Sequence, residues 1–125
     1  MRVRESALRL KRFEVEEKAQ KVRDLQHMIN EFEQMANDLE RQIEAEEERT
    51  GVRDRSHFAY STFARSAFQR RENLMASVQD LRERLENAVT ERDEATAELE
   101  QVDAGFYRDE DRQREDAKET QAETR

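Results

Sequence analysis

The chain has 125 residues, of which 43% are charged and 34% hydrophobic, and it contains no proline, cysteine or tryptophan. This composition is typical of long helices rather than of a globule with a wide core, and the missing cysteine excludes disulfides and thiol chemistry. A formal net charge of -8 argues against a general nucleic-acid binder.

Apolar residues recur with the three-and-four spacing of a heptad repeat, in which positions a and d line one face of a helix. The repeat runs in one phase from Leu8 to Ile43 and continues in the same phase from Tyr60 to Phe106. It fails only in between, where polar residues occupy four consecutive a and d positions: Glu46, Thr50, Arg53 and His57. We therefore expect a turn in this stretch.

Gly51 supports the turn, because a helix commonly ends at a glycine that tolerates positive φ, with a cation such as Arg49 near its last carbonyls. Ser56 or Ser61 can cap the helix that follows. The sequence predicts a first helix over about 3–49, a turn over about 50–60, a second helix over about 61–116 and a frayed tail over 117–125.

The unbroken phase admits two arrangements, an antiparallel hairpin or one long helix that dimerises in parallel. β-branched residues at a with leucine at d favour the parallel dimer. Folding near Arg55 instead opposes residues whose numbers sum to roughly 110, which sets large side chains against small ones, as in Ile43 with Ala67 and Ala36 with Leu74. Both arrangements are all-α, and of the two we predict the long two-helix antiparallel coiled-coil hairpin, which is a monomer in isolation.

The first 23 residues are basic, and two apolar residues there, Leu10 and Phe13, fall off the a/d face. In an antiparallel fold this segment runs beside the acidic stretch 91–100, so flanking ion pairs are one explanation of its charge. The other explanation is a cationic surface that meets an acidic partner. Both interpretations stay open at this point.

Four of the eight aromatic residues lie at the end of the predicted turn or just after it, and only Tyr60 among them lies on the a/d face. They either pack locally over the turn or form an exposed interface with neighbouring arginines, since aromatic and arginine side chains dominate binding hot spots. The candidate residues are Phe58, Tyr60, Phe63, Phe68, Arg70 and Arg71.

Catalytic patterns are missing from the sequence. His27 and His57 are the only histidines and fall on different predicted elements, so a zinc site or a histidine-based triad is not expected. There is no glycine-rich phosphate loop, and a hairpin offers no pocket that excludes water from a catalytic pair. We expect no enzymatic activity, no metal and no cofactor.

The N-terminus lacks the apolar core of a signal peptide and no segment approaches a membrane span, so we expect a cytoplasmic protein without direct membrane insertion.

Two short strings resemble the flagellar export protein FliJ family, in its alphaproteobacterial branch. The first is Arg4-Glu5-Ser6-Ala7-Leu8-Arg9-Leu10-Lys11-Arg12-Phe13, and the second comprises His57-Phe58-Ala59-Tyr60 and Gln69-Arg70-Arg71-Glu72-Asn73-Leu74. The likeness spans both predicted helices but not the last twenty or so residues. One departure is Ser61, where the family pattern leads us to expect a proline at the helix start.

The resemblance implies a cytoplasmic component of the flagellar type III export apparatus, similar to the central stalk of rotary ATPases. Its implied partners are the hexameric export ATPase, the membrane export gate and export chaperones. By position, the ATPase-binding residues would be Arg4, Arg9, Lys11, Arg12 and Phe13, and the aromatic residues at the turn would meet the gate or chaperones. The alternatives are a structural parallel coiled-coil dimer and an export chaperone that uses the methionine and phenylalanine flank.

Overall fold

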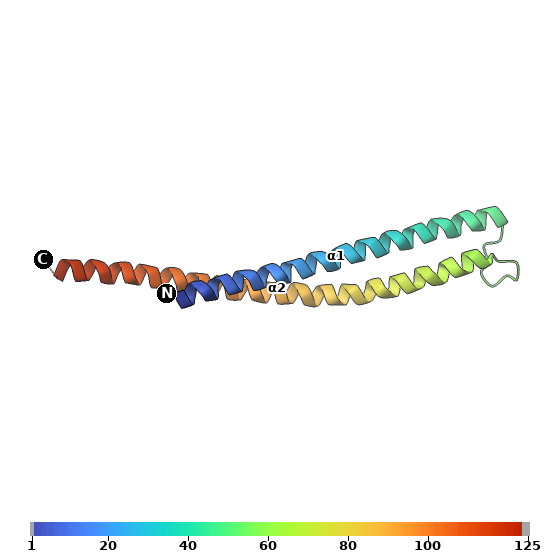
Figure 1. Cartoon of the computed structure of the whole chain (residues 1–125). Coiled ribbons are helices and arrows are strands. Elements are labelled where there is room, and N and C mark those ends of the chain that lie inside the picture. Colours follow the sequence, from blue (N-terminus) through green and yellow to red (C-terminus); the bar gives the residue numbers. More distant parts are fainter. Residues whose placement is uncertain (1, 124–125) are drawn as a thin grey trace. The chain divides into compact units, whose positions relative to one another are not determined.

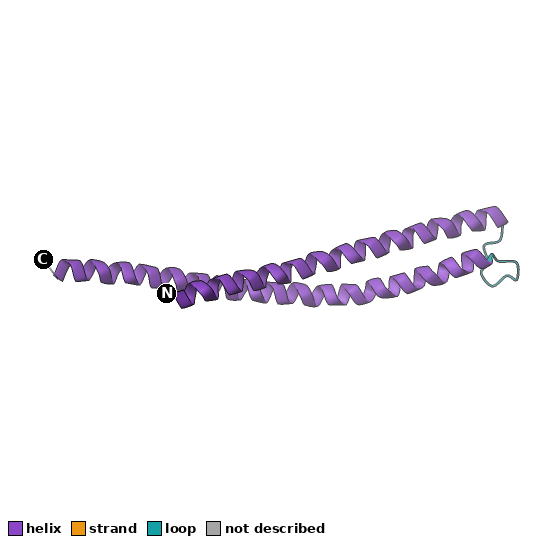
Figure 2. Ribbon diagram, viewed as in Figure 1, coloured by secondary structure: helices purple, strands orange, loops and turns teal. Residues whose placement is uncertain are grey.

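The chain folds into two long helices that pack against each other as a hairpin, and the structure is a computed structural model that describes residues 2–123. Helix α1 is Arg2–Thr50 and helix α2 is Thr62–Glu123, joined by a turn over residues 51–61 (Figures 1 and 2). No strand occurs within residues 2–123. The predicted all-α hairpin is confirmed.

The helix ends follow from local chemistry at the turn. Gly51 adopts a φ of 74°, and its amide donates to the Glu47 carbonyl oxygen at 2.9 Å, which closes the last turn of α1. Ser61 Oγ accepts a hydrogen bond from the Ala64 amide at 3.2 Å and so caps the start of α2. Both helix boundaries at the turn lie within one residue of their predicted positions.

The a and d positions of the heptad repeat form the core. Every buried hydrophobic side chain of the described part of the chain occupies one of them. On α1 these are Leu8, Val22, Leu25, Ile29, Ala36, Leu39 and Ile43, and from the turn onward they are Tyr60, Ala64, Ala67, Val78, Leu81, Ala88 and Ala95. The heptad spacing of apolar residues therefore predicted the packed face of each helix correctly.

The chain divides into two compact units, which we name by their position in the sequence. The turn unit is Arg23–Asn87, and the terminal unit combines Met1–Val22 with Ala88–Arg125. Each contains a segment of α1 and a segment of α2.

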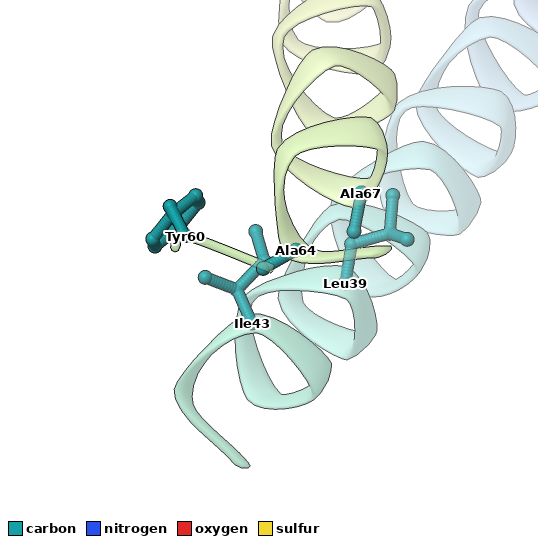
Figure 3. Close-up of a cluster of buried hydrophobic side chains, with 5 residues drawn as sticks. All are labelled: Leu39, Ile43, Tyr60, Ala64 and Ala67. Atoms are coloured by element: carbon teal, nitrogen blue, oxygen red, sulfur yellow. The ribbon is translucent and has the colours of Figure 1, made fainter. Parts of the chain in front are cut away.

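In the turn unit, buried side chains from α1, the turn and α2 form one cluster, namely Leu39, Ile43, Tyr60, Ala64 and Ala67 (Figure 3). Val52, Phe68 and Leu74 pack against it. Ile43 and Ala67 belong to the same cluster, in agreement with the predicted pairing of large and small residues.

In the terminal unit, ion pairs link the two antiparallel segments. Lys11 pairs with Glu98, and Lys18 Nζ lies 3.4 Å from Glu91 Oε2. The two lysines are seven positions apart, and so are the two glutamates, in the opposite direction along the chain, as the predicted register requires.

Helix α2 extends further than the sequence pattern indicated. The predicted end was 116, whereas α2 continues to Glu123, and the side chains of residues 111–122 are all exposed. No glycine or proline follows Gly105, so nothing in the backbone ends the helix, and its own hydrogen bonds continue without a packed face. The predicted tail at 124–125 lies outside the described residues.

Candidate interaction sites

The basic surface comprises the five α1 residues singled out from the sequence, Arg4, Arg9, Lys11, Arg12 and Phe13. All lie in the terminal unit. Carboxylates of α2 lie near three of the four cations: Arg4 Nε is 2.8 Å from Asp109 Oδ2, Arg12 Nη2 is 3.9 Å from Asp103 Oδ1, and Lys11 contacts Glu98. The ion-pair explanation of the basic segment therefore accounts for these three residues.

Lys11 is held most firmly of the three. Its ammonium donates to Glu98 and, at 3.1 Å, to Glu14 Oε2 of its own helix. These hydrogen bonds, that of Glu98 first, raise the pKa of Lys11 and keep it cationic. Lys11 therefore serves as a charged layer between the helices at a d position of the heptad.

The remaining members of the basic surface, Arg9 and Phe13, face solvent, and so does the neighbouring Leu10, which we include in this surface from here on. Leu10 and Phe13 are 69% and 63% exposed, and Arg9 has no ion-pair partner among the described side chains. A small open depression beside them, about 310 Å³ in volume, is lined by Glu5, Leu8, Arg9, Arg12, Phe106 and Tyr107. Arg9, Leu10 and Phe13 are the part of this surface that the hairpin does not use for its own packing.

The aromatic residues at the turn divide into two groups. Tyr60 is buried, and Phe68 packs against the core cluster with the Arg55 guanidinium 3.9 Å from its ring centre. Phe58 and Phe63 are 93% and 55% exposed. Local packing over the turn thus describes one pair, and an exposed surface describes the other.

The two candidate arginines differ in the same way. Arg71 is half-buried, and its Nη2 lies 3.1 Å from Glu40 Oε2, so it joins α2 to α1. Arg70 is exposed and lines an open groove. The accessible part of the predicted turn site is therefore Phe58, Phe63 and Arg70.

Phe58 is exposed on a turn that is held in place by hydrogen bonds. Asp54 Oδ1 accepts from the Ser56 amide at 3.0 Å and from the Ser56 hydroxyl at 2.7 Å, and these bonds lower the pKa of Asp54. The Tyr60 amide donates to the His57 carbonyl at 3.0 Å. The His57 ring stacks on Phe58 with ring centres 4.6 Å apart. The phenylalanine is therefore presented in a set position.

Two side-chain hydrogen bonds fasten the turn to the end of α1. The Tyr60 hydroxyl donates to Glu47 Oε2 at 3.0 Å, and the Ser61 hydroxyl donates to Glu46 Oε1 at 2.9 Å. Arg49 Nε donates to Glu46 Oε2 at 3.1 Å. The pKa of Glu46 is lowered by Arg49 first and by Ser61 second, whereas burial and the bond to Glu47 raise the pKa of Tyr60.

An open groove in the turn unit was not predicted from the sequence. It has a volume of about 610 Å³ and is lined by Phe32, Met35, Asp38, Leu39, Gln42, Arg70, Asn73, Leu74 and Ser77. Met35 is 52% exposed, and Met28, one heptad earlier on α1, is 41% exposed. The signal in the sequence was the placement of both methionines at position g, beside the a/d face, opposite polar residues of α2.

Within residues 2–123, no group of three or more histidine, cysteine, aspartate or glutamate side chains is arranged to hold a metal ion. Across the same residues, neither helix has a stretch that is long and apolar enough to cross a membrane. Comparisons with protein-family models, curated proteins and solved structures give no match to the chain.

Proposed function

We propose that the chain is a stalk-like, non-enzymatic component of a flagellar type III export apparatus, at the cytoplasmic face of the inner membrane. In this role it binds the hexameric export ATPase through the basic surface and stimulates ATP hydrolysis. The exposed residues of the turn contact the export gate or export chaperones. The proposal rests on the resemblance of the two sequence strings to the FliJ family.

The observation that carries the proposal is the exposure of Arg9, Leu10 and Phe13. Heptad positions resemble one another in all coiled coils, so a likeness limited to buried positions would say only that the chain is a coiled coil. These three residues are exposed and contribute nothing to the a/d core. Core packing does not dictate which residues stand at these three positions, so a contact with a partner can. The likeness of the first string to the FliJ family at these positions therefore supports a binding role.

Stimulation of an ATPase ring by such a surface needs charge and a few apolar contacts. Arg9 can pair with carboxylates of the ring, while Leu10 and Phe13 supply the apolar part of a binding hot spot. Arg4, Lys11 and Arg12 act less directly, because their ion pairs to α2 keep the α1 backbone in place under the exposed residues.

The test is ATP hydrolysis by a purified alphaproteobacterial flagellar export ATPase, with the full chain added at increasing concentration. We expect the chain to raise the rate, and Arg9→Gln with Phe13→Ala to raise the half-maximal concentration about tenfold or more, as loss of two hot-spot residues does. Arg112→Gln with Arg114→Gln removes two exposed arginines elsewhere and is the matched control. No stimulation by the unmodified chain, or equal loss in the control variant, would contradict the proposal.

The groove of the turn unit supports a second candidate, an export chaperone. Exposed methionine and phenylalanine side chains adapt to varied apolar segments, and Phe32 and Met35 line this groove. Titration of the chain with unfolded export substrates would favour this role if Met35→Glu abolished binding while Arg9→Gln with Phe13→Ala left it unchanged.

A further inference from the structure

The tip of the turn unit carries an exposed aromatic side chain within a basic segment. Phe58 is 93% exposed, the highest value among the described large hydrophobic residues. Between residues 52 and 70 the charged side chains are four arginines and one aspartate, namely Arg53, Arg55, Arg65, Arg70 and Asp54. This segment therefore has an excess of cations in a chain whose formal net charge is -8, and it adjoins the end of α1, where Glu46 is paired with Arg49 and Glu47 and Glu48 add two more carboxylates.

The single carboxylate of this segment does not neutralise the arginines. Asp54 Oδ1 already accepts two hydrogen bonds from Ser56. Arg55 lies over the Phe68 ring, and Arg65 Nη2 donates to the Arg55 carbonyl at 3.2 Å, so both remain cationic while they brace the turn. Arg53 and Arg70 are exposed, and no described carboxylate pairs with them.

We propose that this tip binds the surface of anionic phospholipid membranes, with Phe58 inserted among the lipids and the arginines against the headgroups. An aromatic side chain favours the boundary between headgroups and acyl chains, and cations are attracted to anionic lipid. The association is peripheral, since neither helix within the described residues has a stretch that could cross the bilayer.

An anionic membrane fits this tip better than an acidic protein does. A stable protein interface covers roughly 800 Å² on each partner around a packed apolar centre. Here Val52 and Tyr60 pack inward and Phe68 packs against the core cluster, so between residues 52 and 70 only Phe58 and the half-exposed Phe63 offer a large apolar side chain to a partner. Lipids rearrange around one inserted ring, and so they need no complementary pocket.

Most of the rest of the chain is acidic, so anionic lipid repels it. The exception is the basic first 23 residues, where Arg4, Lys11 and Arg12 are paired with carboxylates of α2. We expect weak and reversible binding that depends on salt. Each arginine at the surface multiplies the partition coefficient by about five, and burial of the Phe58 ring multiplies it by about ten or more.

The experiment uses the full chain with vesicles of phosphatidylcholine, either pure or with about 30% phosphatidylglycerol. Because the chain has no tryptophan, Phe58→Trp gives a single fluorescent probe at the tip. Its emission should shift to shorter wavelength only with anionic vesicles, and the shift should be lost between about 50 and about 300 mM NaCl. Met28→Trp, at a methionine that is 41% exposed on α1 away from the tip and from the basic surface, is the matched control and should not shift.

Co-sedimentation with the same vesicles measures the contribution of each group. Phe58→Ala should reduce binding about tenfold, and Arg53→Gln with Arg70→Gln should reduce it about twentyfold. Arg112→Gln with Arg114→Gln should not reduce it. Circular dichroism establishes that each variant keeps its helices.

Absence of an emission shift with anionic vesicles would overturn the inference. So would equal binding to neutral vesicles, or binding that survives the loss of Arg53 and Arg70. If the chain ignored vesicles but bound a polyglutamate peptide through Phe58, the tip would be a site for an acidic protein instead. No export ATPase is present in these measurements, so their outcome is independent of the proposed contact between the basic surface and the ATPase.

Discussion

Tyr60 and Glu47 join the turn to the end of α1, because the tyrosine hydroxyl donates a hydrogen bond to Glu47 Oε2 across 3.0 Å. The ring of the same tyrosine is buried against Ile43 and Ala64 (Figure 3). Tyr60 thus contributes both apolar packing and a hydrogen bond, at the position where the heptad repeat resumes.

Tyr60→Phe separates these two roles. The ring stays in the cluster while the hydrogen bond to Glu47 is lost, so we expect the free energy of unfolding to fall by about 1 kcal/mol. Tyr60→Ala also removes the ring and should lower it by about 3 kcal/mol or more. Urea unfolding followed by circular dichroism measures both, with Tyr107→Phe at an exposed tyrosine as control. Equal loss in Tyr60→Phe and Tyr107→Phe would rule out a stabilising role for the bond.

The carboxylate of Glu46 makes the stability of the turn dependent on pH. Its folded pKa is lowered by Arg49 and Ser61, so its contribution is present above the unfolded pKa of about 4.3 and is lost as the pH falls through the folded value. Asp54, whose pKa is lowered by Ser56, acts in the same direction from about 3.9 downward. We therefore expect thermal stability to decline below about pH 4.5.

Glu46→Gln tests this assignment, because glutamine keeps an acceptor for Ser61 but does not titrate. The variant should have a lower melting temperature near neutral pH and a shallower decline in acid than the unmodified chain. Glu44→Gln, at an exposed glutamate on the same helix, is the control. An acid decline of unchanged steepness in Glu46→Gln would show that other groups are responsible.

Ala64 and Ala76 offer a direct test of the a/d core. Both lie on α2 in the turn unit, but Ala64 is fully buried and Ala76 is exposed. Leucine at 64 has no room beside Ile43 and Leu39, so Ala64→Leu should lower the free energy of unfolding by about 1–3 kcal/mol. Ala76→Leu should change it by less than about 0.5 kcal/mol. Similar effects at both positions would mean that the predicted face is not the packed one.

Gly105 is covered by the side chain of Arg4 in the terminal unit. A Cβ atom at Gly105 would lie 2.6 Å from Arg4 Nη1, so alanine there must shift the guanidinium, whose Nε lies 2.8 Å from Asp109 Oδ2. Alanine also favours the helix by about 1 kcal/mol. Gly105→Ala should therefore stabilise an Arg4→Ala background by that amount and the unmodified chain by less. A gain of the same size in both backgrounds, measured by urea unfolding, would show that Arg4 does not rest on this glycine.

The helices, the turn and the packed face could be predicted because they depend on local patterns. A heptad spans about two turns of a helix, so the apolar pattern can be followed from the sequence alone. Its loss between Glu46 and His57 marks the connection between the helices, whatever their arrangement in space. The antiparallel register could also be predicted, since opposing Ile43 to Ala67 satisfies the volume of each layer.

The division of the aromatic residues could not be predicted in the same way. Phe68 and Phe63 are both off the a/d face in sequence, but Phe68 packs against the core cluster with Arg55 over its ring, whereas Phe63 is 55% exposed. The groove beside Phe32 likewise depends on which α2 residues lie opposite, namely small or polar ones such as Ser77 and Asn73. The extension of α2 to Glu123 was missed because an exposed charged helix has no apolar period to follow.

The measurement that tests the central claim most directly is the distance between spin labels at positions 10 and 100, together with the mass of the protein in solution. The chain has no cysteine of its own, so Leu10→Cys with Glu100→Cys places the only two labels, and both positions belong to the terminal unit. An antiparallel pairing of α1 with α2 predicts a 15.0 kDa monomer with the labels within about 20 Å of each other. A dimer with no such short distance within one chain would contradict the hairpin and remove the physical basis of the proposed stalk.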